Sequence, residues 1–230
     1  MTITAVGAVQ QDGDSGSVSS LSVAMGSLAI GDYLVLGSIA LATSPPFPYV
    51  YSVAGGGVPA SGPGSWTKMA GANYDETNRD VEIWVGKIAS LTPDVVTVDY
   101  NNFAGGFTVD TARIACQQFH SSIGNLTLAA EGAETSDTLG DQATGTYFNL
   151  NGIGLYFACG LFNTPVSGST SGFTYVNGIG GGTGGAVVWN ASAAGLQAPG
   201  WDQGSSGNFG TCSILMIEVS PSSAQQVMIS

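Results

Sequence analysis

The chain has 230 residues, of which only 9% are charged, and its 16 acidic against 4 basic residues give a formal net charge of −12. Ordinary globular domains carry about 25% charged residues, and a content of 35 glycines leaves few strong helix formers in any window. This composition excludes long helices and favours a single all-β domain of 230 residues. The negative charge would repel phosphate backbones and anionic lipids, so we expect neither nucleic-acid binding nor membrane insertion.

Low charge combined with a mean hydropathy of +0.24 leaves a surface that does little to oppose association. We therefore expect a homo-oligomer or packing against other chains, the alternative being a neutral Gly/Ser-rich surface that tolerates solvent. Cys116, Cys159 and Cys212 lie in apolar runs and are predicted to be core positions rather than a disulfide framework. No basic segment with an apolar core follows Met1, and apolar runs end at about a dozen residues, so neither a signal peptide nor a transmembrane span is expected.

Residues 31–43 are the most apolar segment of the first half and predict a strand that is buried on both faces. Strand side chains alternate between faces, and here both sets are apolar, interrupted only by Gly37 and Ser38. One face carries Tyr33, Val35, Ile39 and Leu41, and the other carries Leu34, Leu36 and Ala40.

The remaining segments predict a series of shorter strands. Residues 2–9 are expected to form an edge strand or arm, and residues 10–20 a polar loop. Residues 43–65 hold five of the nine prolines and are predicted to be a long contact loop, since such a composition cannot form a central strand. Further strands are predicted at residues 18–25, 66–70, 81–89, 94–100 and 107–120.

The second half repeats the strand order of the first. Residues 152–162 echo 31–43, residues 172–176 echo 65–69, residues 186–189 echo 81–84, and residues 213–219 echo 113–119. We predict a single domain, 1–230, that forms a jelly-roll-like antiparallel β-sandwich with two pseudo-repeated halves, both contributing strands to both sheets. Residues 1–27 would be an N-terminal strand or arm and loop, residues 28–221 the sandwich core, and residues 222–230 a C-terminal tail.

The order of these motifs resembles a jelly-roll domain family of bacteriophage virion proteins. The matching motifs are Gly31-Asp32, Ser65-Trp66-Thr67, Val95-Val96-Thr97-Val98, residues 152–162, Gly172-Phe173-Thr174 and residues 212–221. The resemblance implies a non-enzymatic virion component without a cofactor, most simply a minor tail protein, assembled in the host cytoplasm with other virion proteins and contacting the host surface through its loops. The alternatives are a capsid decoration or head protein, or a glycan-binding module.

Residues 13–16, Gly-Asp-Ser-Gly, copy the tetrapeptide around the nucleophile of trypsin-like proteases. That family needs a histidine upstream of the serine, whereas the sole histidine, His120, lies far downstream of Ser15. We expect a plain Gly/Ser/Asp turn.

Three further groups of residues suggest metal or acid–base chemistry. Asp12 and Asp14 are spaced as in calcium loops, but the later bidentate acid is missing. Cys116 and His120 share a strand face, yet two ligands do not make a zinc site. The acids Asp75, Glu76, Asp80 and Glu82 could gather a cation or form a carboxyl pair for glycoside chemistry, although a solvated hairpin tip is favoured.

The four tryptophans divide into core and surface candidates. Trp66, Trp84 and Trp189 occupy predicted strands and are expected in the core. Trp201 lies in the Gly/Pro/Ser-rich residues 191–210, predicted to be a loop, and is expected to be an exposed aromatic contact. Together with Asp75 and Glu76 it forms the candidate loop contact that a glycan-binding module would use.

Overall fold

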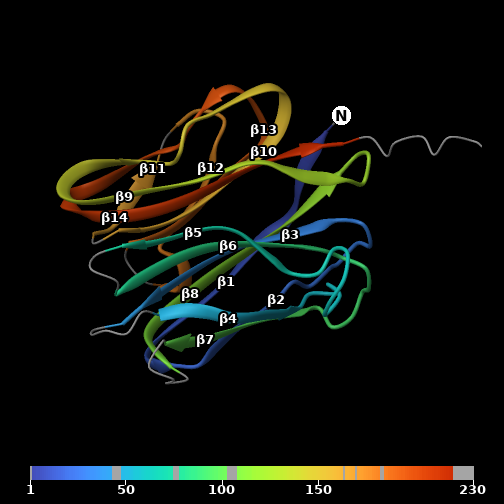
Figure 1. Ribbon diagram of the computed structural model, residues 1–230, viewed down its shortest axis with the longest axis horizontal. Helices are drawn as coiled ribbons and strands as arrows, with labels where there is room; N and C mark the ends of the chain where they lie inside the picture. The colour runs from blue at the N-terminus through green and yellow to red at the C-terminus, as the bar shows by residue number, and fades with distance from the viewer. Residues whose placement is uncertain are drawn as a thin grey trace, which may run out of the picture.

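The computed structural model consists of three antiparallel β-sheets stacked as layers, which confirms the predicted all-β sandwich (Figure 1). It describes residues 2–42, 48–74, 78–102, 108–162, 164–168, 170–181 and 184–219. Within these ranges the one helical element is a 3₁₀ turn, η1 (Ile179–Gly181). In the same ranges no helix is long and apolar enough to cross a membrane.

The first half of the chain builds two of the layers. Its strands are β1 (Ile3–Val18), β2 (Ser20–Ala24), β3 (Tyr33–Leu41), β4 (Pro48–Gly55), β5 (Thr67–Tyr74), β6 (Arg79–Lys87), β7 (Val95–Asn102) and β8 (Val109–Ser121). Sheet A has the order β1-β8-β3-β6-β5, and sheet B has the order β2-β7-β4. This is the strand order of an eight-stranded jelly roll, except that β5 extends the edge of sheet A instead of joining sheet B.

The second half builds the third layer, sheet C. Its strands are β9 (Leu126–Thr144), β10 (Phe148–Phe162), β11 (Val166–Gly168), β12 (Thr174–Asn177), β13 (Gly185–Gln197) and β14 (Gly200–Glu218). The order β9-β14-β10-β13-β12, with β11 also beside β14, repeats that of sheet A position by position. The predicted pseudo-repeat is therefore confirmed.

The expectation that both halves share both sheets is wrong. Sheets A and B contain only strands from the first half, and sheet C only strands from the second. Partners within one half are closer along the chain, so pairing them closes shorter loops at a lower cost in entropy.

Sheet A is the middle layer, between sheet C and sheet B (Figure 1), and β3 runs through its centre. Tyr33, Val35 and Ile39 lie in the core between sheets A and C, which we call the A–C core. Leu34, Leu36 and Ala40 lie in the core between sheets A and B, the A–B core. The prediction that both faces of this strand are buried is confirmed. Leu155 and Phe157 of β10 face the A–C core, so they pack in the same core as Tyr33, whereas Leu36 lies in the A–B core.

Three segments predicted as loops contain strands. Residues 10–18 continue β1 along β8, with register shifts on either side of residues 10–15 and a positive φ of 93° at Gly16. Residues 48–55 form β4 at an edge of sheet B, where Pro48 can occupy the first position. Residues 191–210 belong mostly to β13 and β14. Long neighbouring strands supply backbone partners to glycine-rich and polar segments that have little strand propensity of their own.

Candidate functional site

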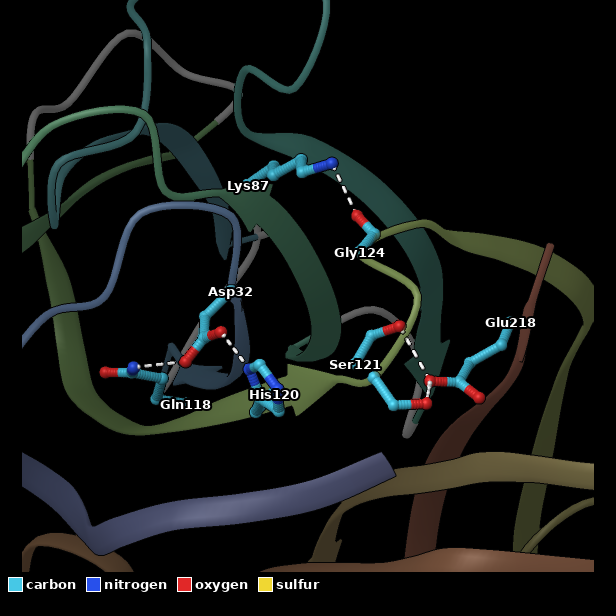
Figure 2. Close-up of polar contacts among 8 residues, drawn as sticks. Asp32, Lys87, Gln118, His120, Ser121, Gly124 and Glu218 are labelled. Atoms are coloured by element: carbon cyan, nitrogen blue, oxygen red, sulfur yellow. Dashed lines mark hydrogen bonds and ion pairs between the residues drawn. The ribbon is translucent and has the colours of Figure 1, made fainter. Parts of the chain in front are cut away.

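Polar side chains gather where the two halves of the chain join, between β8 and β9 (Figure 2). Ser121 and Ser122 donate hydrogen bonds to Glu218 Oε1 over 2.8 Å and 3.2 Å. Glu218 is the last residue of β14, so these bonds connect the end of sheet A to the end of sheet C. Burial acts to raise the pKa of Glu218, but the serine hydroxyls outweigh it and the pKa is lowered.

Beside this junction, His120 forms a hydrogen-bonded pair with Asp32, its Nδ1 lying 2.7 Å from Asp32 Oδ1 (Figure 2). The second carboxylate oxygen accepts a 2.7 Å hydrogen bond from Gln118 Nε2. The Asp32 side chain is 5% exposed and that of His120 is 57% exposed. A carboxylate that orients an imidazole is half of a catalytic acid–base arrangement. No hydroxyl or thiol of the described residues hydrogen-bonds to this imidazole, so the contact orients His120 without completing a site.

The structure separates His120 from Ser15, the candidate protease nucleophile. Ser15 pairs with Thr111 in the β1–β8 ladder, whereas His120 pairs with Thr4. Thr111 and His120 are nine positions apart on β8, which corresponds to about 30 Å along a strand. Ser15 is part of β1 rather than of the expected turn, and no catalytic triad can form from these two residues.

The two candidate metal pairs do not assemble into clusters. The Asp12 carboxylate accepts hydrogen bonds from the backbone N–H groups of Gly13 and Ser22. Cys116 is buried in the A–B core, while His120 is exposed about 13 Å further along β8. Among the described residues, no group of three or more His, Cys, Asp or Glu side chains is placed to hold a metal ion.

The structure describes two of the four acidic residues predicted to form one solvated turn. Asp75 and Glu76 lie outside the described residues, while Asp80 and Glu82 are 2% and 1% exposed, so the expected solvated tip is wrong for this second pair. Glu82 accepts hydrogen bonds from Lys68 Nζ at 2.8 Å and from Trp84 Nε1 at 2.6 Å. Burial raises the pKa of Asp80 well above its usual range, and the neighbouring Glu82 charge raises it further.

Burial has the opposite effect on the pKa of Lys68, which is only partly buried, because it disfavours the charged ammonium. Burial acts to lower the pKa of Lys68, but the hydrogen bond and charge of Glu82 outweigh it and raise the pKa. Asp80 and Glu82 therefore form a buried carboxyl pair, and Lys68 neutralises part of its charge.

The prediction that Trp201 is an exposed aromatic contact is wrong. Its side chain is 0% exposed, and it lies in β14 on the outer face of sheet C. It packs at 5.3 Å from Phe162 and 6.1 Å from Tyr175, measured between ring centroids. The aromatic side chains of sheet C cover this face themselves, so a tryptophan in a polar segment is drawn into a core.

The other tryptophans follow the prediction in different degrees. Trp189 is 7% exposed in the A–C core, whereas Trp66 and Trp84 are partly buried against the A–B core. The expected core position is therefore confirmed for Trp189, whereas Trp66 and Trp84 are only partly buried, and composition misled the interpretation of Trp201.

A cavity of about 460 Å³ opens between sheets A and C next to the junction of the halves. Lys87 lies at its rim, with Nζ 2.6 Å from the Gly124 carbonyl oxygen (Figure 2). The same Nζ lies 3.1 Å from Asn125 Oδ1. The ammonium also lies 5.3 Å from the centroid of the Tyr33 ring. Sequence reasoning missed this group because its residues are spread over three segments with no shared motif.

Comparison with known proteins gives no relative for this fold or site: no family model matches the chain, and neither a curated protein nor a solved structure is significantly similar to it.

Proposed function

We propose that this protein is a non-enzymatic structural component of a bacteriophage virion, most simply a minor tail protein that acts by packing against other subunits. The observation that carries the proposal is the jelly-roll strand order of sheets A and B, because the motif order that resembles phage virion proteins maps onto these strands and their repeats in sheet C. A charged fraction of 9% supports extensive subunit contact.

Exposed apolar side chains suggest where such packing would occur. Tyr147, Ile153 and Leu196 are 62%, 50% and 66% exposed, and they lie at the same end of the β10–β13 ladder. Apolar side chains grouped on a surface are typical of contact sites. We assign this end of sheet C, defined by these three residues, as the subunit-packing surface.

The glycan-binding alternative loses its main residue, because Trp201 is inaccessible to a sugar ring. The host-surface contact through loops and the capsid location remain expectations from the resemblance alone. Fractionating particles into heads and tails distinguishes a tail protein from a decoration or head protein.

Two measurements test the proposal. Mass spectrometry of purified particles is expected to detect the chain in a fixed ratio to the major virion proteins, and light scattering is expected to show an oligomer. Leu196→Asp should reduce the mass in solution, while Tyr51→Asp, an equally exposed position on β4 of sheet B, should leave it unchanged. A stable monomer that is also absent from particles would rule the proposal out.

A further inference from the structure

The cavity between sheets A and C has apolar walls and a positively charged side chain, that of Lys87, at its rim. We propose that it binds a small amphipathic carboxylate, an aliphatic chain that ends in one carboxylate group, with that group at Lys87. The proposal is independent of the virion assignment, because it rests only on the residues that line the cavity.

The walls of the cavity are continuous with the A–C core. Val85 and Met216 are 3% and 1% exposed, and they belong to both the cavity lining and the core. Met69 and Leu128 complete the apolar lining as partly buried side chains. A volume of about 460 Å³ lies within the 300–1,000 Å³ range of small-molecule sites, and flexible Met and Leu side chains adapt to an aliphatic chain.

The charge at the rim is not neutralised by the protein. The chain has 16 acidic and 4 basic residues, and Lys68, for comparison, is paired with the Glu82 carboxylate. Lys87 instead contacts the neutral oxygens of Gly124 and Asn125, and no carboxylate of the described residues pairs with it. An ammonium has three N–H donors, so one remains for an oxygen of a ligand. Hydrogen bonds between two charged groups are the stronger ones, which favours a carboxylate over a neutral group.

A second donor lies on the same rim. The Tyr33 hydroxyl oxygen accepts a 3.0 Å hydrogen bond from the Leu126 backbone N–H. In the part of the chain that the structure describes, no acceptor takes the hydrogen of this hydroxyl. Tyr33 and Lys87 both line the cavity, so a carboxylate there can accept from an ammonium and from a phenol.

Isothermal titration of the full chain with sodium decanoate, below its micelle-forming concentration, tests the site. We expect saturable binding at one site per chain. Lys87→Gln, which keeps a donor for Gly124 but removes the charge, should weaken decanoate binding about tenfold or more, equivalent to about 1.4 kcal/mol. Lys87→Arg keeps the cation and should lie closer to the wild type. Decan-1-ol, which has the same chain without the charge, should bind the wild type and Lys87→Gln equally.

Blocking variants test the location of the site. Leu128→Trp fills the cavity and should abolish binding of both probes, and Thr67→Trp should do the same from an exposed position on the rim. Leu91→Trp is the control: it is the same leucine-to-tryptophan substitution as Leu128→Trp, but at an exposed position outside the cavity. It should have no effect on the binding of either probe. Thermal unfolding of each variant verifies that it folds.

Two results would overturn the proposal. The first is an absence of saturable decanoate binding to the wild type, or binding that neither Lys87→Gln nor the blocking variants change. The second is an oligomer that Leu128→Trp and Thr67→Trp dissociate, because the cavity would then be a contact between copies of the chain.

Discussion

Gly37 of β3 lies directly against Cys159 of β10, so closely that a Cβ atom at position 37 would come within 2.9 Å of Cys159 Sγ. The same atom would lie 2.7 Å from Cγ1 of Val187 on β13. On the opposite face of β3, the neighbouring Ser38 hydroxyl lies 3.0 Å from the Tyr100 hydroxyl of β7 in sheet B. Gly37 and Ser38 are the two residues that interrupt the apolar run of β3. Gly37 therefore allows the close contact with sheet C, and Ser38 forms the hydrogen bond with sheet B.

Gly37→Ala is expected to lower the free energy of unfolding by about 1–3 kcal/mol, because the added methyl group overpacks the contact between sheets A and C. Urea denaturation measures this change. Gly200→Ala is the matched control, since a Cβ there meets only Thr170 Oγ1 at an ordinary distance of 3.6 Å. Equal effects of the two substitutions would show that the close approach at Gly37 is not restrictive.

Asp80 should make the stability depend on pH. Burial, reinforced by Glu82, raises the Asp80 pKa well above its ordinary value of 3.8, so the folded state holds this proton more tightly than the unfolded chain. Its stabilising contribution is therefore complete below pH 3.8 and is lost as the pH rises through the raised pKa. Asp80→Asn mimics the protonated form at every pH.

Urea denaturation at a series of pH values measures the difference between the wild type and Asp80→Asn. We expect similar stabilities below pH 3.8 and a variant that becomes the more stable of the two as the pH rises toward neutrality. A difference that stays constant across this range would contradict the assignment of the raised pKa to Asp80.

Trp201 is expected to stabilise the fold rather than to bind a ligand. Trp201→Ala removes a fully buried side chain and should cost roughly 3–5 kcal/mol in the free energy of unfolding. Trp201→Phe should cost less, because the indole N–H has no hydrogen-bond partner in the described structure and its loss leaves no acceptor unpaired. Leu91→Ala, at an exposed position outside the subunit-packing surface, should change stability by no more than about 0.5 kcal/mol. A glycan bound by the wild type and lost in Trp201→Phe would refute this interpretation.

The three cysteines should be unreactive in the folded protein. Cys116, Cys159 and Cys212 are free and buried, as predicted, and burial raises the pKa of each thiol. The thiolate is the reactive form, so Ellman's reagent should label none of them under native conditions and all three after denaturation. Rapid labelling of any thiol in the native protein would show that the cores open more readily than the packing implies.

The alternation of side chains in residues 33–41 was sufficient to predict β3 and both of its buried faces, because a strand that is apolar on both sides can only be covered on both sides. The repeated motif order likewise predicted which strands of the two halves correspond. Strands such as β9 and β4 were missed because their sequences are polar or proline-rich, and their pairing depends on partners that are distant in the chain.

Burial of individual polar and aromatic residues was decided only by the tertiary structure. Asp80 and Glu82 resemble a solvated turn in sequence and are buried because β6 lies inside sheet A. Trp201 lies in a segment typical of a loop and is buried because β14 passes under the aromatic side chains of sheet C. The rim of the cavity, formed by Tyr33, Lys87 and Asn125, exists only because sheets A and C meet at the junction of the halves. Local alternation determines which faces of a strand are apolar, but the layer that covers each face depends on contacts between residues far apart in the chain.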